Sequence, residues 1–235
     1  MKKFALFLLT LLLAATTFGQ AGKQTFDLAA GAMFPLGDLA DNNLADSSSG
    51  ASSVGYHIQV GYNYQLSNNF GIGIHVEFND AKYSMKKVRE YYETLLDDAT
   101  KEISSEAGWT IGGIYLRYFI RFPLGSKVSW DISPMVGGMG TYSPQYQIIR
   151  TSFPVHKTDT YIRQRSKAFS FAYGVETRFN FKVNQHGFFL ESSILRSKAN
   201  FKQVTGTGYD GKPYDQNIKM DLMYVSAYLG YAYYF

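Results

Sequence analysis

The sequence predicts an all-β protein, an eight-stranded antiparallel up-and-down transmembrane β-barrel with an N-terminal signal peptide. Eight segments alternate between apolar side chains and small or polar ones, which is typical of strands whose two faces meet different surroundings. Phe, Tyr and Trp make up 17% of the residues, as expected for the aromatic girdles of a membrane barrel. Beyond the N-terminal segment, no apolar run reaches the roughly 18 residues that indicate a spanning helix.

The N-terminal residues 1–20 have the pattern of a secretory signal peptide. Two lysines precede an apolar run over residues 4–13, and the small residues that follow predict cleavage near residues 19–21. Residues 21–235 are then expected to form one barrel domain without a linker. Loss of the two lysines lowers the formal net charge from +4 to +2, which favours no particular partner. The chain has no cysteine, which excludes disulfides and thiolate metal sites.

The alternating segments have well-defined positions. They are residues 25–34, 54–66, 70–79, 113–122, 128–137, 168–181, 188–195 and 218–235. In the last one, Tyr231, Tyr233 and Phe235 fall on the apolar face, whereas Ser226 and Gly230 fall on the small face. Aromatic residues at alternate positions up to the C-terminus resemble the signal that the barrel-insertion machinery reads. The segment therefore predicts a closing strand and a C-terminal assembly signal.

The connections between the segments are short and long in turn. Short turns are expected at 67–69, 123–126 and 184–187, and long loops at 36–53, 85–107, 143–167 and 202–217. Outer-membrane barrels keep short turns on the periplasmic side, and an even number of strands places both chain ends there. The loops would then face the exterior and offer sites for an extracellular or secretion-system protein.

Three details of this arrangement are open to test. Segment 85–107 has apolar residues at helical spacing, which favours a short amphipathic helix over an extension of the flanking strands. The ends of segment 143–167 alternate and predict a hairpin that continues into water. Pro134 lies within a segment of a closed sheet and lacks an N–H group, which predicts a local bulge there.

Alternation alone does not separate a membrane barrel from a soluble, lipocalin-like one, because both alternate with opposite orientation. Here the polar face is rich in Gly, Ala, Ser and Asn, whereas a water-facing surface would carry many Lys and Glu. The other face is occupied by bulky Phe, Tyr, Ile, Leu and Val, too large to fill so narrow an interior. The small face is therefore predicted to line the lumen, and the aromatic face to contact outer-membrane lipid.

With this orientation, a set of charged side chains points into the lumen. Its members are Asp27, Glu77, Arg117, Arg121, Asp131, Glu176, Arg178 and Glu191. Unpaired charges in so narrow an interior are costly, so the set is predicted to form ion pairs that plug the barrel. Which residues pair depends on strand register, which alternation does not determine.

Catalytic and metal-binding alternatives have weaker sequence support. His57 or His75 with Glu77 is the best candidate for a general acid–base pair, but no nucleophile occurs at an informative spacing. Asp38, Asp41 and Asp46 in the first long loop match no calcium-loop pattern. A packed polar interior and a solvated acidic loop are the favoured interpretations. No catalytic residue, cofactor or metal is therefore predicted.

Basic residues can attract two kinds of acidic partner, phosphate-bearing or acidic polymers and nucleic acid. The third loop, 143–167, could contact lipopolysaccharide phosphates or an acidic polymer by charge attraction, although a solvated hairpin is favoured. No feature of the sequence supports nucleic-acid binding.

The assembled pattern resembles the outer-membrane β-barrel domain family of Bacteroidetes-type bacteria, which includes PorT-like proteins. The resemblance covers the whole mature chain and rests on GAMFPLGDLA at 31–40, GIGIHVEFN at 71–79, IYLRYFIRFPLG at 114–125, SPMVGGMG at 133–140 and YLGYAYYF at 228–235. It implies an OmpA/OmpX-like barrel in the outer membrane and supplies no catalytic residues. PorT-like members are associated with type IX secretion, which the resemblance implies as an alternative role.

The sequence thus predicts a non-enzymatic outer-membrane barrel with a plugged lumen. Its role is expected to be structural, adhesive or one of partner recognition through the loops. The alternatives are a type IX-like secretion component, a narrow channel and a small lipid-modifying barrel enzyme.

Overall fold

A computed structural model describes residues 24–43, 46–95, 100–152 and 157–235. The predicted signal peptide at 1–20 and its cleavage site lie outside the described residues. No helix within these residues is long and apolar enough to cross a membrane.

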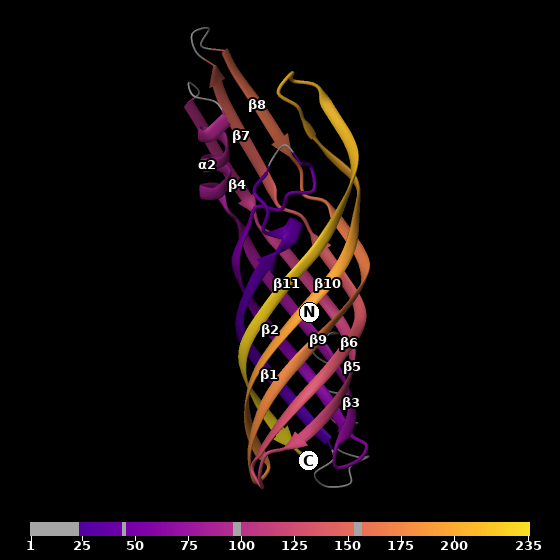
Figure 1. Cartoon of the computed structure of the whole chain (residues 1–235). Coiled ribbons are helices and arrows are strands. Elements are labelled where there is room, and N and C mark those ends of the chain that lie inside the picture. Colours follow the sequence, from indigo (N-terminus) through magenta and orange to yellow (C-terminus); the bar gives the residue numbers. More distant parts are fainter. Residues whose placement is uncertain (1–23, 44–45, 96–99, 153–156) are drawn as a thin grey trace, which may run out of the picture.

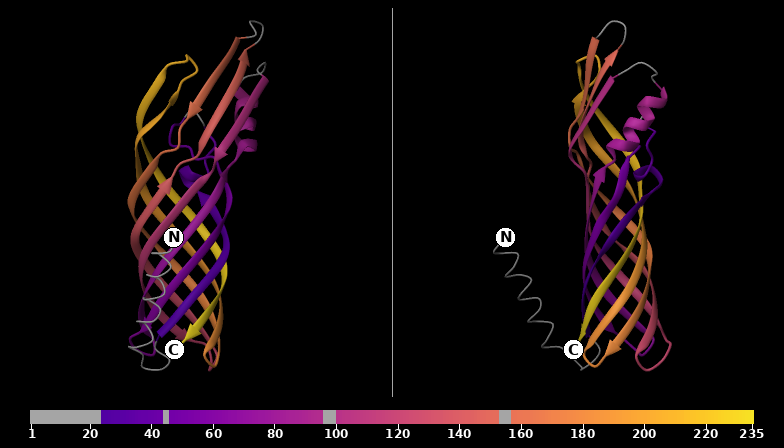
Figure 2. Two further views of the ribbon diagram at one scale, coloured as in Figure 1. Left: turned by 180° about the vertical axis from the view of Figure 1, so that it is seen from behind. Right: turned by 90° about the vertical axis from the view of Figure 1, so that its left-hand side faces the viewer.

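Eight strands close into an antiparallel barrel, which confirms the predicted fold (Figures 1 and 2). The ring order is β11, β1, β2, β3, β5, β6, β9 and β10, and β10 pairs with β11 to complete it. The strands are β1 (Gln24–Leu36), β2 (Ser52–Gln65), β3 (Phe70–Tyr83), β5 (Trp109–Pro123), β6 (Val128–Tyr142), β9 (Lys167–Val183), β10 (His186–Thr207) and β11 (Pro213–Tyr234).

The short turns predicted from the sequence all lie at one end of the barrel, where β2–β3, β5–β6 and β9–β10 are joined (Figure 1). The C-terminus lies at the same end. The amide of Phe235 donates to the carbonyl of Gln24 over 3.0 Å and so ties the first and last strands together. By the general arrangement of bacterial outer-membrane barrels, this end is periplasmic.

The two faces of the wall meet the surroundings that alternation predicts. Side chains such as Phe169, 80% exposed, and Leu229, 69% exposed, point outward, whereas Tyr224 and Tyr228 are buried inside. On β11 the outward residues from Tyr233 to Met223 are all aromatic or apolar. Ten steps of about 3.3 Å, tilted by roughly 40°, give a band about 25 Å tall, the height of a bilayer's hydrocarbon core in such barrels. This band places the chain in the outer membrane.

The wall continues above the barrel as extended strands (Figure 2). β4 (Thr100–Ala107), β7 (Gln145–Ser152) and β8 (Lys157–Arg163) form an antiparallel sheet, which we call the raised sheet. It joins the barrel where Arg163 of β8 pairs with Gly206 of β10. The long β10–β11 hairpin rises beside it (Figure 1). Two further short elements are η1 (Gly37–Leu39) and α2 (Met85–Leu95).

These elements revise the predicted long loops. Segment 85–107 contains both the helix α2 and the strand β4, so its two alternatives are both realised. Segment 143–167 is largely the hairpin β7–β8, as its alternating ends predict. The prediction of a loop over 202–217 is wrong, because strand pairing between β10 and β11 continues to Thr207 and Pro213. Alternation in that segment is hidden by a bulge between Phe201 and Val204.

The predicted bulge at Pro134 is wrong as well. The pairing of β5 with β6 keeps one register on both sides of the proline, with Arg117 opposite Met135 and Ile120 opposite Ile132. The two intervening pairs are missing from this ladder, whereas Pro134 still lies opposite Val175 of β9. The missing N–H is therefore accommodated by a local gap in one ladder, and no residue is inserted.

Candidate functional site

The centre of the lumen is organised around Arg178 on β9. Its Nη1 donates to Asp27 of β1 and its Nε donates to Glu191 of β10. Asn63 adds a 2.7 Å hydrogen bond to Asp27, and the hydroxyl of Tyr228 donates to Glu191. All of these side chains are buried. One guanidinium therefore joins strands from the two ends of the chain across the barrel.

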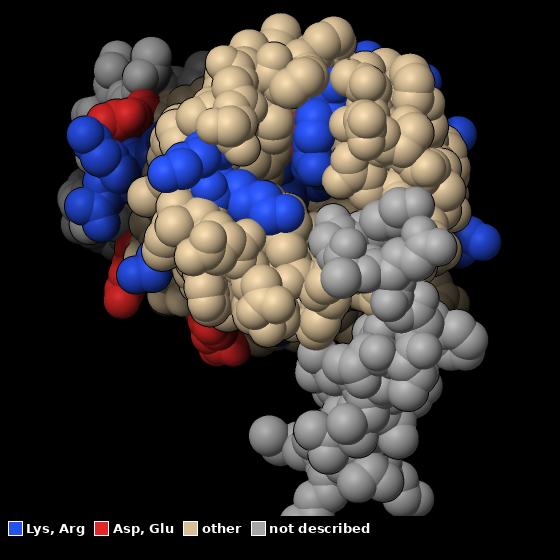
Figure 3. Space-filling model, turned by 90° about the horizontal axis from the view of Figure 1, so that it is seen from below, with Lys and Arg blue, Asp and Glu red and all other residues tan. Residues whose placement is uncertain are grey.

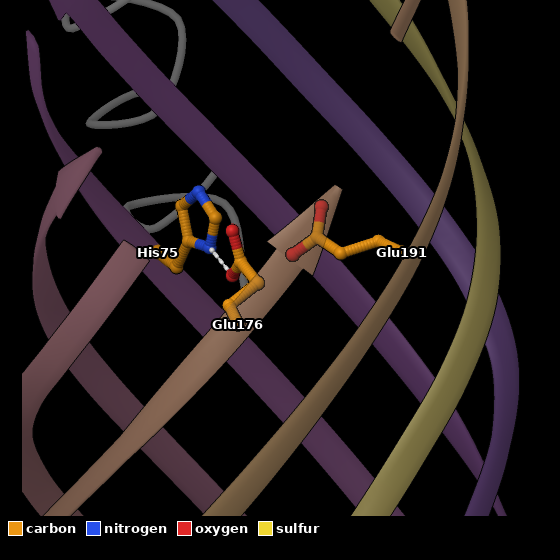
Figure 4. A group of neighbouring side chains, drawn as sticks. All are labelled: His75, Glu176 and Glu191. Atoms are coloured by element: carbon orange, nitrogen blue, oxygen red, sulfur yellow. Dashed lines mark ion pairs between the residues drawn. The ribbon is translucent and has the colours of Figure 1, made fainter. Parts of the chain in front are cut away.

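A second ion-pair group lies around Glu176 on β9 (Figure 4). Nη1 of Arg117 donates to Oε1 of Glu176 and to Nε2 of His75, the latter over 3.0 Å. Because a guanidinium only donates, Nε2 of His75 must be the acceptor, and the ring proton lies on Nδ1. This Nδ1 faces Oε2 of Glu176 at 3.4 Å, the contact drawn as a dashed line in Figure 4.

His75, Glu176 and Glu191 have ligand atoms within 4.8 Å of one another, a spacing that a metal ion could bridge. The candidate ligand atoms of His75 and Glu191 are otherwise engaged. Nδ1 of His75 carries a proton as long as Arg117 donates to Nε2, and a metal requires a deprotonated nitrogen. Both oxygens of Glu191 accept hydrogen bonds, from Arg178 and Tyr228. The three residues therefore fit an ion-pair network and do not fit a metal centre.

Glu77 on β3 has a different set of partners, all neutral. It accepts hydrogen bonds from the hydroxyls of Tyr115 and Tyr224 and from the amide of Asn79. Asn79 also bonds Nδ1 of His57 over 2.7 Å. No guanidinium of the described residues lies within ion-pair distance of this carboxylate, so hydroxyl and amide donors provide its compensation.

The acid–base pair considered from the sequence is not assembled. His75 contacts Arg117 and Glu176 instead of Glu77, and His57 reaches Glu77 only through Asn79. The ring of His57 stacks on Tyr228 with centroids 4.3 Å apart. Both histidines and the glutamate are buried, so the arrangement offers no open surface on which a substrate could react.

The periplasmic end of the lumen is closed by a third pair. Arg121 donates to both oxygens of Asp131 over 2.8 and 2.7 Å, and Asn180 donates to the same carboxylate over 2.9 Å. Nearby, Nζ of Lys182 lies 4.2 Å from the ring centroid of Tyr234. Figure 3, viewed from this end, shows Lys and Arg side chains gathered in the centre of the barrel mouth.

Glycines create the room for these groups. The ring of Phe189 lies against Gly230, where an added Cβ would come within 2.0 Å of it, and the guanidinium of Arg178 lies 4.0 Å from the centroid of the same ring. Gly71 accommodates the ring of Phe119 in the same way. Aromatic rings packed over glycines thus make cation–π contacts with the buried guanidiniums.

All eight charged residues assigned to the lumen from the sequence point inward, and seven of them belong to two groups or to the Arg121–Asp131 pair. Sequence reasoning missed the neutral members of the network. These are Gln59, Asn63, Asn79, Tyr115, Asn180, Tyr224 and Tyr228. Strand alternation in the sequence could have identified them, because each falls on the lumen side of its strand.

The aspartates of the first long loop have structural roles. Asp38 accepts the amide of Asp221 over 2.8 Å, and Asp41 accepts the amide of Asn43 over 3.1 Å. Asp46 accepts both the amide and the hydroxyl of Ser48, and these bonds lower the pKa of its carboxyl. The three side chains are thus engaged in separate turn contacts.

Beneath the raised sheet lies a second hydrophobic cluster, separate from the lumen groups. Val88 of α2 packs with Ile103, Tyr146 and Ile148 of the sheet. The ring of Tyr161 lies 5.6 Å from that of Tyr214, and their hydroxyls are 2.8 Å apart. Burial and the neighbouring tyrosines raise the pKa of Tyr161. The extracellular part therefore has a core of its own and is an ordered platform.

The C-terminal aromatic residues lie on the outer surface at the periplasmic end. The rings of Tyr233 and Phe235 are 5.0 Å apart, edge to face. Tyr231 packs edge to face against Phe188 at 5.8 Å and contacts His186. They form part of an aromatic girdle at the membrane border.

Comparison with known proteins gives structural matches only. No protein-family model and no curated protein sequence matches the chain. Among solved structures, Neisserial surface protein A is 11% identical, with a TM-score of 0.48, and the alignment covers 92% of this chain and 99% of that one. A major outer membrane protein from Thermus thermophilus is 14% identical, with a TM-score of 0.46 and coverage of 90% and 99%. Ail, the attachment invasion locus protein of Yersinia pestis, is 10% identical, with a TM-score of 0.40 and coverage of 92% and 99%.

Proposed function

We propose that the protein is a non-enzymatic outer-membrane barrel that holds an extracellular recognition platform above the membrane. The observation that carries this proposal is the structural difference between the lumen and the raised sheet. The lumen is crossed by buried ion pairs, whereas the raised sheet has its own hydrophobic core and extends into the exterior. The barrel then acts as an anchor, and adhesion or partner recognition takes place on the platform.

The plugged lumen leads to a first prediction. The purified barrel, inserted into planar lipid bilayers, is expected to show no steady single-channel current. Arg178 and Arg117 pair inside the lumen with Asp27, Glu191 and Glu176, and two of these pairs connect strands that are not neighbours in the ring. A porin of known conductance in the same bilayers is the control. Steady, reproducible current steps from the barrel alone would contradict the plug and favour the channel alternative.

Partner recognition is tested by a photo-crosslinking residue placed on the platform. Ser104 of β4 is exposed on the raised sheet, and Ser126 is exposed in the β5–β6 turn at the opposite end. Irradiation of whole cells is expected to give a discrete adduct from position 104 and none of the same mass from position 126. If neither position 104 nor the other exposed platform positions give an adduct, partner recognition is contradicted and a structural role remains.

A third prediction concerns assembly. We infer that Tyr231, Tyr233 and Phe235 are recognised by the barrel-insertion machinery, since they are outward-facing aromatics at the end of the closing strand. Deletion of Phe235 is expected to lower the amount of folded barrel severalfold, measured as the fraction that resists unfolding on an unheated gel. The control is Phe169→Ala, which removes an exposed aromatic at the other border. Equal yields from both variants would exclude a special role for the C-terminus.

The type IX secretion alternative is supported only by the sequence motifs that resemble PorT-like proteins. It would be favoured by an adduct from the platform that contains a protein of that system. The lipid-modifying alternative has no support from the buried arrangement of His57, His75 and Glu77.

A further inference from the structure

A group of basic side chains lies on the outer surface, just above the apolar band and on one side of the barrel. We call Arg165, Lys167, Lys202 and Lys219 the basic stripe. All four are exposed, and they lie on three neighbouring segments of the wall, at the start of β9 and on the upper parts of β10 and β11. Adjacent strands are about 4.8 Å apart, so the three lysines lie on neighbouring strands, and Arg165 extends the stripe toward β6 and β5 on the other side of β9.

The contacts between the strands confirm that the stripe is continuous. The hydroxyl of Ser166 donates to the carbonyl of Lys202 over 3.3 Å, which brings the start of β9 beside β10. Lys219 lies opposite Asn200, two residues from Lys202. Arg165 is held by a 2.7 Å hydrogen bond to Thr110, with its guanidinium 5.0 Å from the ring centroid of Tyr142.

The stripe lies at the level of the lipid headgroups. Lys167 precedes Phe169 and Phe171 on the outward face of β9, and these rings are 80% and 66% exposed. Exposed aromatic rings at the end of an apolar band mark the membrane border in such barrels. On a strand tilted by roughly 40°, two residues rise about 5 Å along the membrane normal, so the ammonium of Lys167 reaches the phosphate layer of the outer leaflet.

A bulge in β10 builds one part of this surface. Strand register shifts between Phe201 and Val204. Gln203 has a φ of +55°, a backbone conformation that residues other than glycine rarely adopt. As a result Lys202 and Gln203 are both exposed, whereas regular alternation would turn one of them inward. The amide of Gln203 is held by the side chain of Asn217 over 3.2 Å.

The charge of the stripe is largely uncompensated. Within the described residues, no carboxylate lies within ion-pair distance of Lys167, Lys202 or Lys219. Asp221, two residues from Lys219, is paired with Arg196. The next two strands of the ring beyond β11 are β1 and β2, and they contain no Lys or Arg. The stripe therefore ends at β11 on that side.

We propose that the basic stripe binds the phosphate groups of a phosphorylated glycolipid in the outer leaflet, with its acyl chains against Phe169 and Phe171. Ammonium and guanidinium groups form charge-assisted hydrogen bonds with phosphate oxygens. The height of the stripe selects a membrane-bound phosphate over a soluble one, because its lower border is the lipid-facing apolar surface. The bulge positions Lys202 toward the same layer.

The test compares two variants with the same change in charge. In the first, Lys167, Lys202 and Lys219 become glutamine; in the second, the exposed Lys86, Lys127 and Lys212 do. Binding of a bisphosphorylated glycolipid and of its dephosphorylated form is measured by titration of the full-length mature barrel in zwitterionic micelles. The stripe variant is expected to bind the phosphorylated form roughly tenfold or more weakly than wild type, and the control variant to bind as wild type.

Four outcomes decide the proposal. Loss of affinity in the stripe variant alone, with weak binding of the dephosphorylated form to every protein, supports it. Equal affinity of the two variants overturns it, as does equal binding of both lipid forms to wild type. Tight binding of a soluble inorganic polyphosphate that displaces the glycolipid shows a general anion surface, which also overturns the lipid assignment. Unheated-gel mobility of each variant establishes that the barrel is folded.

Discussion

Replacement of Arg178 by methionine is expected to lower the free energy of unfolding by about 3–5 kcal/mol, the usual effect of breaking a buried ion pair from one side. The guanidinium compensates Asp27 and Glu191, which stay buried when it is removed. Its contact with the ring of Phe189 is lost as well. Urea unfolding in lipid vesicles, followed by the fluorescence of the two tryptophans, measures the change.

Two further variants make this test specific. Arg196→Met breaks an ion pair on the outer surface and is expected to leave the unfolding midpoint close to that of wild type, since exposed pairs contribute little. The double variant Arg178→Met with Glu191→Gln is expected to recover part of the lost stability, because one buried charge is removed with its partner. Equal losses for Arg178→Met and Arg196→Met would show that the lumen network does not stabilise the barrel.

Replacement of Glu77 by leucine is expected to have the second largest effect, a loss of roughly 3 kcal/mol or more. The change leaves three buried donors without their acceptor, on Tyr115, Tyr224 and Asn79, and each unsatisfied group costs about 1–3 kcal/mol. Glu77→Gln keeps one acceptor oxygen and is expected to lose clearly less. The same unfolding measurement compares the two variants, and a leucine variant as stable as the glutamine variant would contradict the role of Glu77 as an acceptor.

The faces of the strands were predictable from the sequence because a strand alternates with period 2. Tyr224 and Tyr228 fall on the lumen side by counting alone, and so does each charged residue assigned to the plug. Partners were not predictable, because pairing depends on register and on the curvature of the closed ring. Arg178 reaches Asp27 across 151 positions of sequence, a contact that no local pattern encodes.

The extracellular part was predicted less well, for two physical reasons. A single irregular residue such as Gln203 shifts the alternation and makes a long strand resemble a loop. The strand β4 of the raised sheet is short and rich in polar residues, so its pattern resembles that of a solvated connection. The bulge predicted at Pro134 is absent, because a sheet can tolerate a missing hydrogen bond without changing register.

The pairing of β1 with β11 also determines the order of events during folding. Thr25 lies opposite Tyr234, so the seam joins segments that are separated by nearly the whole chain. Contacts of such separation form slowly, because a long loop must close before they contribute. The Arg178–Asp27 pair and the Tyr224–Glu77 bond also depend on both chain ends. Sealing the wall and completing these two contacts of the interior are therefore expected late, after synthesis of the last strand, whereas the Arg117–Glu176 and Arg121–Asp131 pairs involve neither chain end.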